Sequence, residues 1–334
     1  MMGYLILRCT SRLDAFSVYY IRTRLPGYAP GGTTDAPEVR PTRSSRTKVS
    51  SSQISNAHDR NVAVSSLNCT GLQLTFSDTS NASGDFSFIN SVLKNCKWSS
   101  SGSKATLTLN LAQKGKFYGF HYEYNNNGQL VITVNHKTPS LKGAVIMLDP
   151  GHGGIDGGAP CVVKATGFEN EKDINLSIAT KIKEILEAEG ATVIMTRSSD
   201  KWVCYTDRNN FVRDRNPDVY ISIHCDSSSS SASATGTSAY YYRAYSQPLA
   251  KAVHNRLVEA YKYKIYADSP DIKVDRGTNF YAFRVTRVEE CPAILIEYGF
   301  VSNTGECDAL QKAENRDILA QATVDGIKDY LSAS

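Results

Sequence analysis

Hydrophobic and polar residues follow two different rhythms along this chain of 334 residues. Before the midpoint, apolar residues occupy alternate positions in several stretches, for example 72–76 and 118–124. Such alternation is typical of strands with one buried face. The run Asn125-Asn-Asn-Gly128, followed by renewed alternation over 130–134, indicates a hairpin. We therefore expect a small antiparallel β domain, arranged as a sandwich, over residues 61–136.

From residue 144 onward, short apolar runs alternate with helical patterns. The predicted strands are 144–148, 191–195, 219–223, 238–242 and 293–297. One helix is indicated by an apolar stripe at Ile174, Ile178, Ile182 and Ile185, with Gly190 as its stop signal. Further predicted helices are 205–215, 247–262 and 314–331. This order predicts an α/β fold, with a central mainly parallel or mixed sheet flanked by helices.

Three regions follow from these patterns. Residues 1–60 are expected to form an N-terminal segment and a linker, because 25–60 are rich in Pro, Gly, Ser, Thr and Arg. The small β domain follows over 61–136, and the α/β domain occupies 144–334. The chain begins with an apolar run too short for a clear signal peptide, so we expect either another export route or a sequence truncated at its start.

Composition narrows the classes of partner. The chain is 41% hydrophobic and 21% charged, and no apolar run reaches membrane-spanning length, so we expect no stable membrane insertion. Residues 1–143 carry 16 basic and 7 acidic side chains, whereas the rest carry 21 and 26. A basic front half could attract an anionic polymer such as nucleic acid or cell wall. We favour a solvated basic linker and expect no nucleic-acid partner.

Polar side chains stand at the ends of three predicted strands. His152, His224 and Glu297 each follow an apolar run, and Glu171 lies at the start of a predicted helix. The carboxyl ends of parallel strands share one edge of a sheet, and sites form there. Two His and one Glu make a three-ligand zinc set with a position open for water. The second Glu can serve as general base or acid, and Glu169 competes with Glu171 as a ligand.

Each of these residues also has an ordinary explanation. A lone His can be a turn or edge residue, Glu297 can be a solvated strand end, and Glu171 suits the first turn of a helix. The glycine-rich turn around His152 could hold phosphate, but it lacks the Lys-Ser/Thr of a P-loop. Only the convergence of all four residues at one sheet edge favours a metal hydrolase.

Several short motifs resemble one enzyme family when taken together. They are Asp149-Pro-Gly-His-Gly-Gly154, Glu171-Lys-Asp173, Thr196-Arg197, Ser222-Ile-His224, Arg276-Gly277 and Ile296-Glu-Tyr-Gly-Phe-Val-Ser-Asn303. Their order over residues 144–332 resembles the zinc-dependent N-acetylmuramoyl-L-alanine amidases of the amidase type 3 group. That resemblance implies a central six-stranded sheet and hydrolysis of the amide between N-acetylmuramic acid and the L-alanine of the stem peptide.

The resemblance also assigns roles. It implies one Zn²⁺ per catalytic domain, held by His152, Glu171 and His224, with Glu297 as the catalytic residue. The Glu that Lys-Asp follows is the family's ligand, which selects Glu171 over Glu169. Peptidoglycan is the implied partner, at an extracellular or cell-wall location that the chain reaches by export or by release on lysis. The small β domain is expected to bind the cell wall.

One departure from the family pattern and two alternative functions remain. Cys225-Asp226 stands where the family usually has Ala-Asn; strand alternation predicts that Asp226 faces the same side as His224. One alternative is a catalytically altered relative that only binds peptidoglycan, although such relatives typically lose one of the four residues retained here. Another is a different zinc amidohydrolase or peptidase, which a His-Glu-x-x-His motif would favour; the chain has none.

Overall fold

The computed structural model divides the chain into two compact units, Met1–His136 and Lys137–Ser334. It describes residues 3–10, 17–23, 62–68, 71–76, 84–87, 93–102, 104–112, 117–124, 130–135, 137–165, 167–269 and 272–333. Each unit has its own sheets and is described by itself. The predicted linker over 25–60 lies outside the described residues.

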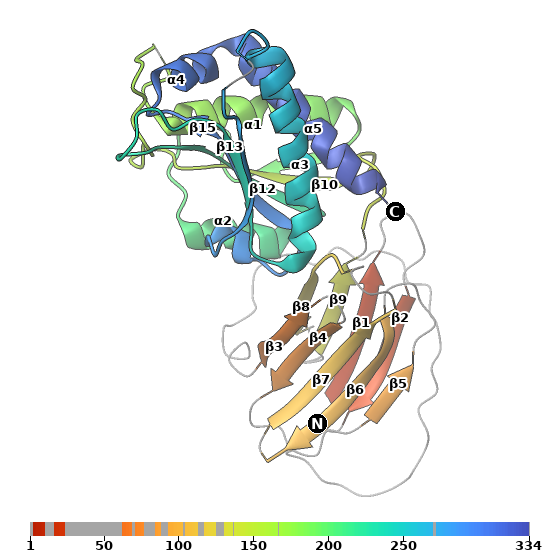
Figure 1. The fold of residues 1–334 in the computed structure, drawn as a ribbon. Coiled ribbons are helices and arrows are strands. Elements are labelled where there is room, and N and C mark those ends of the chain that lie inside the picture. The colour runs from red at the N-terminus through yellow and green to blue at the C-terminus, as the bar shows by residue number, and fades with distance from the viewer. Residues whose placement is uncertain are drawn as a thin grey trace, which may run out of the picture. The chain divides into compact units, whose positions relative to one another are not determined.

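The N-terminal unit consists of two β-sheets (Figure 1). Four strands in the order β2-β1-β9-β8 form one: β1 (Gly3–Thr10), β2 (Ser17–Thr23), β8 (Phe120–Tyr124) and β9 (Leu130–Asn135). Five in the order β3-β4-β7-β6-β5 form the other: β3 (Val62–Asn68), β4 (Gly71–Phe76), β5 (Gly84–Ser87), β6 (Leu93–Ser101) and β7 (Lys104–Leu111). Leu72 and Leu74 of β4 are buried, as alternation predicts. The predicted hairpin strands, β8 and β9, pair antiparallel.

Two features of this unit differ from expectation. Strands β1 and β2 lie within residues 1–60, which we expected to be a terminal segment and linker. The short apolar run at the start of the chain pairs along β9, where backbone hydrogen bonds favour an extended chain. That pairing is parallel, whereas the other strand pairs of the unit are antiparallel, as predicted.

The C-terminal unit is built on a mixed six-stranded sheet in the order β11-β10-β12-β15-β13-β14. Its strands are β10 (Val145–Pro150), β11 (Thr192–Met195), β12 (Val219–Asp226), β13 (Thr237–Tyr241), β14 (Asp275–Phe280) and β15 (Ala293–Phe300). The first four strands of that order are mutually parallel, and β13 runs antiparallel to β15. The predicted α/β class is therefore confirmed. Of the six strands of this sheet, only β14 was not predicted, because its sequence Asp-Arg-Gly-Thr-Asn-Phe is polar.

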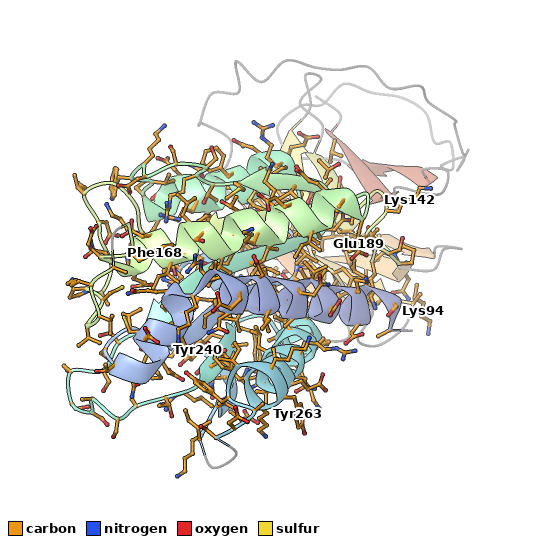
Figure 2. The ribbon with its side chains drawn as sticks, turned by 90° about the horizontal axis from the view of Figure 1, so that it is seen from above. Lys94, Lys142, Phe168, Glu189, Tyr240 and Tyr263 are labelled. Atoms are coloured by element: carbon orange, nitrogen blue, oxygen red, sulfur yellow. The ribbon has the colours of Figure 1, made fainter. Side chains whose placement is uncertain are left out.

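Helices cover both faces of this sheet. They are α1 (Glu171–Ala188), α2 (Tyr205–Arg215), α3 (Gln247–Ala260), α4 (Thr304–Gln311) and α5 (Ala313–Ser332), with the single turns η2 (Ala244–Ser246), η3 (Tyr261–Ile265) and η4 (Val285–Arg287). On one face α1, α5 and α3 lie side by side (Figure 2). Their apolar stripes pack on Ile146, Ile221 and Ile294. The opposite face packs against α2 and η4 through Met147 and Leu295.

Local sequence explains where α1 begins and ends. The Asp173 side chain accepts a hydrogen bond of 3.1 Å from the backbone N–H of Asn170, the residue before the helix. This contact satisfies a donor that the helix itself leaves free. Gly190 has a φ of +88°, a conformation that glycine adopts readily, and it lies just beyond the last turn. The start of α1 is thereby fixed at the sheet edge where β10 and β12 end.

Candidate metal centre and active site

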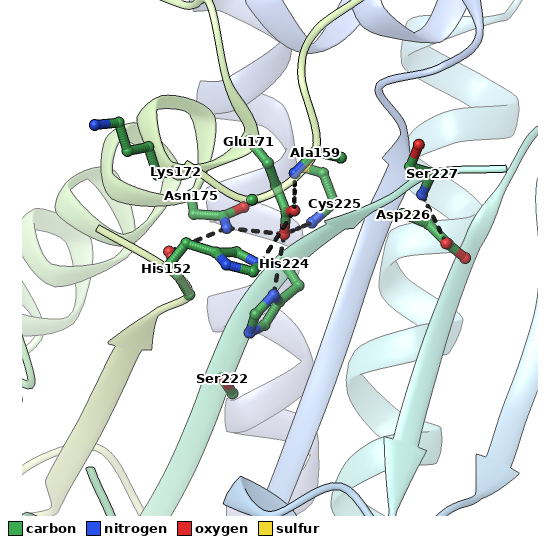
Figure 3. A network of polar contacts seen from close by, with 12 residues as sticks. His152, Ala159, Glu171, Lys172, Asn175, Ser222, His224, Cys225, Asp226 and Ser227 are labelled. Carbon is green, nitrogen blue, oxygen red and sulfur yellow. Dashed lines mark hydrogen bonds and ion pairs between the residues drawn. The ribbon is translucent and has the colours of Figure 1, made fainter. Parts of the chain in front are cut away.

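Three side chains from three elements meet beyond the carboxyl ends of β10 and β12 (Figure 3). They are His152 in the turn after β10, Glu171 in the first turn of α1, and His224 near the end of β12. Each offers one potential ligand atom, and these three atoms lie within 4.8 Å of one another. Among the described residues, no other group of His, Cys, Asp and Glu has this arrangement. We call these three residues the His–Glu–His cluster.

Glu171 is the centre of the cluster. Its Oε2 lies 3.2 Å from Nε2 of His152, and its Oε1 lies 3.0 Å from Nδ1 of His224. The same carboxylate accepts backbone N–H bonds from Ala159 at 3.0 Å and Cys225 at 3.1 Å. A buried carboxylate needs such partners, and Glu171 is only 4% exposed. The predicted competitor, Glu169, is not part of the cluster.

His152 is oriented by a second carboxylate. Its Nδ1 lies 2.9 Å from Oδ1 of Asp156, so its other ring nitrogen faces Glu171. Metal-binding histidines usually donate their remote N–H to such an acceptor, which fixes the tautomer and the ring orientation. Asp156 is not among the site residues predicted from the sequence. Its position four residues after His152, in a glycine-rich turn, was the only available signal.

Glycines leave the space into which the cluster packs. A Cβ on Gly151 would lie 2.2 Å from Cε1 of His224. On Gly158, whose φ is +67°, it would lie 2.5 Å from Oε2 of Glu171 and 2.7 Å from Cδ2 of His152. Side chains at either position would displace the potential ligands. The glycine-rich turn thus serves the close approach of the cluster.

The electrostatics of the cluster favour a cation. Burial tends to raise the pKa of Glu171. The hydrogen bonds from His152 and His224, together with the charges of these two side chains, outweigh burial and hold that pKa well below its usual range. Burial tends to lower the pKa of His152, but the carboxylates of Glu171 and Asp156 outweigh it and raise that pKa. Both shifts show that positive charge is stabilised between these side chains.

Glu297 lies on the strand next to His224. Strands β12 and β15 are parallel neighbours, and their Cα register pairs His224 with Glu297. Both side chains project from the α2 side of the sheet. The residues on either side of them along the strands, at positions 223, 225, 296 and 298, belong to the core on the other face. The Oε2 of Glu297 is buried and has no hydrogen-bond partner among the described residues. Burial, followed by the charges of Glu171 and Asp226, raises the pKa of Glu297 well above its usual range.

A second buried network supports the turn from beneath. Asp149 pairs with Arg208 of α2 and accepts hydrogen bonds from Thr196 Oγ1 at 2.6 Å and Ser222 Oγ at 2.8 Å. We call these four residues the Asp149 network. Arg208 also donates to the carbonyl of His152 at 2.8 Å. The network therefore ties β10, β12 and α2 to the backbone of the proposed metal ligand.

The departure at residues 225 and 226 does not displace the cluster. Cys225 points into the core, as strand alternation predicts, while its N–H binds Glu171. The β12–β15 register shifts between His224 and Asp226, so simple alternation no longer places Asp226. Its carboxylate accepts the N–H of Ser227 at 2.7 Å and lies apart from the cluster in Figure 3. Burial, with a smaller contribution from the charge of Glu171, raises the pKa of Asp226 despite the opposing Ser227 N–H and Arg276.

The donor set and its surroundings fit a zinc ion. One carboxylate and two imidazoles are a common ligand set of catalytic zinc, and three protein ligands leave a position for water or substrate. Here the three donors converge, a carboxylate orients one imidazole, and glycines clear the space beside them. Glu297 lies close to this edge and adds a carboxylate oxygen that has no hydrogen-bond partner among the described residues. This arrangement can hold one divalent cation beside a general base.

Known proteins resemble the same part of the chain. The family model described as N-acetylmuramoyl-L-alanine amidase matches residues 146–329. A probable cell wall amidase LytH of Staphylococcus epidermidis is 33% identical over 221 residues, which are 66% of this chain and 68% of that protein. The corresponding protein of Staphylococcus saprophyticus is 34% identical over 226 residues, or 68% and 70%.

Solved structures agree with these sequence relatives. The catalytic domain of CwlV, an N-acetylmuramoyl-L-alanine amidase from Bacillus (Paenibacillus) polymyxa var. colistinus, is 31% identical with a TM-score of 0.51. It matches 57% of this chain and 99% of that one. An N-acetylmuramoyl-L-alanine amidase of Clostridium difficile 630 is 30% identical with a TM-score of 0.52, over 58% and 99%. The chain therefore belongs to the family of N-acetylmuramoyl-L-alanine amidases.

Proposed function

We propose that the protein is a zinc-dependent peptidoglycan hydrolase that cleaves the amide between N-acetylmuramic acid and the L-alanine of the stem peptide. The observation that carries this proposal is the His–Glu–His cluster beside the unpartnered carboxylate of Glu297. Family membership supplies the reaction class, and the four residues expected for it are all present at one sheet edge. One Zn²⁺ would be held by His152, Glu171 and His224.

The chain's own residues would divide the chemistry as follows. Bound zinc would supply a Lewis acid that polarises the amide carbonyl and makes water easier to deprotonate. Glu297 would accept the proton of the attacking water and deliver it to the nitrogen of the departing L-alanine. Its buried position favours such proton movement, because a nearby cation would lower the raised pKa of this carboxyl. Asp156 would keep Nε2 of His152 directed at the metal.

The two alternative functions are less well supported. A relative that only binds peptidoglycan has no need for a buried acid without a described partner, and Glu297 is such a residue. A peptidase of the His-Glu-x-x-His kind would take two ligands and its base from one helix, whereas the cluster here draws on β10, β12 and α1. The amidase proposal accounts for both observations.

The direct test is a product analysis on purified peptidoglycan. Wild-type protein should release stem peptides with a new amino-terminal alanine and leave intact glycan strands, and a chelator should stop this release. Metal analysis should find one zinc per chain, and the His152→Ala variant should have far less. New reducing ends without new alanine amino groups would contradict the proposed bond, and full activity in chelator would contradict the metal.

We further propose that residues 61–136, with the paired strands β1 and β2, hold the enzyme on the cell wall. The separate cores of the two units support a division between attachment and chemistry. A protein of residues 137–334 should still hydrolyse soluble muramoyl peptides but should sediment less with intact wall. If this folded fragment attaches as well as the full chain, the β unit is not the attachment module.

An extracellular or cell-wall location follows from this activity, since peptidoglycan lies there. The similar Staphylococcus proteins are described as probable cell wall amidases. Within the described part of the chain, no helix is long and apolar enough to cross a membrane. Fractionation of cells should place the protein with the wall or the medium. Recovery in the cytoplasmic fraction alone, from cells that have not lysed, would contradict this location.

A further inference from the structure

A pocket lies on the sheet beside the proposed catalytic centre, over β13 and β14. It has a volume of about 480 Å³ and is lined by residues of β13 and β14, by Thr235 and Lys273 before them, and by Tyr281 after β14. Ser238 is opposite Glu297 in the β13–β15 register, and Glu297 is opposite His224 in the β15–β12 register. These three side chains form a row on the α2 side of the sheet. The row leads from a proposed metal ligand to a wall of the pocket.

The pocket offers two cationic side chains. Lys273 and Arg276 both line it, and both are exposed. The carboxylate that also lines it, Asp275, is already engaged by His254 Nε2 at 2.8 Å and by the N–H of Gly277 at 2.9 Å. Arg276 is held in place by its bond to the carbonyl of Thr235 and by the ring of Phe300. The lining itself therefore presents two cationic side chains and one engaged carboxylate, while the charges of Asp226 and Glu306 act on Arg276 from outside it.

Aromatic and neutral polar groups complete the lining. Tyr240, Phe280 and Tyr281 form its apolar wall, and the last two rings are 64% and 57% exposed. Exposed rings of this kind provide contact area for an extended chain. A volume of several hundred Å³ matches sites that bind small ligands, with a few polar groups fixing their orientation. The lining thus suits a ligand that has both an anionic group and apolar surface.

The two halves of the proposed substrate differ in charge. N-acetylated sugars are neutral, and the lactyl group of the muramoyl residue is neutral when it is joined to alanine as an amide. Carboxylates therefore occur in the stem peptide, on the departing side of the scissile bond. Complementary charge determines which group enters such a pocket. Resting on the proposed function, we infer that this pocket binds the stem peptide beyond L-alanine, with Lys273 and Arg276 holding a carboxylate.

The test compares two soluble substrates of the same length. They are N-acetylmuramoyl tripeptides whose carboxylates beyond L-alanine are either free or amidated. The wild-type full-length protein should show a higher kcat/KM for the free acid. Lys273→Met should lower kcat/KM for the free acid by about 3- to 10-fold, as expected for loss of an exposed charged contact, and should leave the amidated substrate almost unaffected.

Two further variants control for structural damage. Lys273→Arg keeps the charge and should restore most of the preference for the free acid. Lys251→Met removes an exposed lysine of α3, outside the pocket, and should change neither rate. Wild-type activity without discrimination between the substrates, or an equal loss on both in Lys273→Met, overturns the inference alone. A wild-type protein inactive on both substrates overturns the proposed function and the inference with it.

Discussion

Asp149 and Glu171 are both buried carboxylates near one sheet edge, but their partners differ in kind. Asp149 is fully buried, and its partners are a buried arginine and two hydroxyl groups. Glu171 is 4% exposed, and its side-chain partners include two imidazoles that can be neutral. A permanently charged partner such as Arg208 already neutralises the carboxylate of Asp149, so this carboxylate has no need of a metal ion. The difference shows that the charge of the partners separates a structural carboxylate from a potential ligand.

The largest expected effect comes from Glu297, whose buried oxygen has no described partner. Glu297→Gln keeps the shape of the side chain but cannot accept a proton. Because general-base catalysis contributes typically about 10²–10⁴-fold, we expect amidase turnover to fall by at least that much. Zinc content and thermal stability should stay close to wild type. Glu289→Gln, outside the cluster, is the matched control; a loss of zinc in Glu297→Gln would make Glu297 a fourth ligand.

The Asp149 network should respond in stability rather than in chemistry. Asp149→Asn leaves the guanidinium of Arg208 buried without its counter-ion. Breaking a buried pair in this way costs about 3–5 kcal/mol, measured as the free energy of unfolding in urea. Asp329→Asn removes the exposed partner of Arg256 and should cost no more than about 1 kcal/mol. Equal costs for the two variants would show that burial does not distinguish these pairs.

The sequence predicted the edge of the sheet better than the contacts behind it. Apolar runs located β10, β12 and β15, and topology then brought His152, His224 and Glu297 to one place. The choice of Glu171 over Glu169 came from family resemblance, and the structure places only Glu171 in the cluster. The roles of metal ligand and base remain predictions.

The remaining contacts could not be predicted, for physical reasons. Asp156 reaches His152 through a turn whose course depends on glycine dihedrals. Arg208 lies on α2, which has almost no apolar stripe, so nothing local indicates that its guanidinium is buried under β10. Strand β14 is a polar edge strand that is stabilised by pairing with β13. For Arg208 and β14 the determining partner is distant in sequence, whereas for Asp156 it is close in sequence and the path of the turn decides the contact.

A smaller effect is expected from Asp156, which contacts a proposed ligand without being part of the cluster. Asp156→Ala removes the acceptor of His152 Nδ1 and should weaken zinc binding by about 10- to 100-fold, in line with other such acceptors. Asp156→Asn retains an acceptor oxygen and should lose less. Competition with a coloured chelator measures both affinities. An unchanged affinity in the alanine variant would remove Asp156 from the metal centre.

The smallest effect concerns the pH dependence of stability. Burial tends to raise the pKa of Asp149, but Arg208, Thr196 and Ser222 together lower it. The stability from this carboxylate is therefore complete above the ordinary aspartate pKa of about 3.9 and is lost as the pH falls below it. Urea unfolding between about pH 5 and pH 2 should show a shallower pH dependence in Asp149→Asn than in wild type. Parallel curves would mean that Asp149 titrates normally.

The pairing of His224 with Glu297 across β12 and β15 has a consequence for how the protein tolerates sequence drift. Neighbouring strands of any sheet lie about 4.8 Å apart, because backbone hydrogen bonds set that distance whatever the side chains are. The strand spacing of the sheet therefore fixes the backbone distance between the proposed ligand and the proposed base. Substitutions throughout the surrounding core can accumulate without changing this spacing, whereas a slip of one residue in register would turn Glu297 to the opposite face.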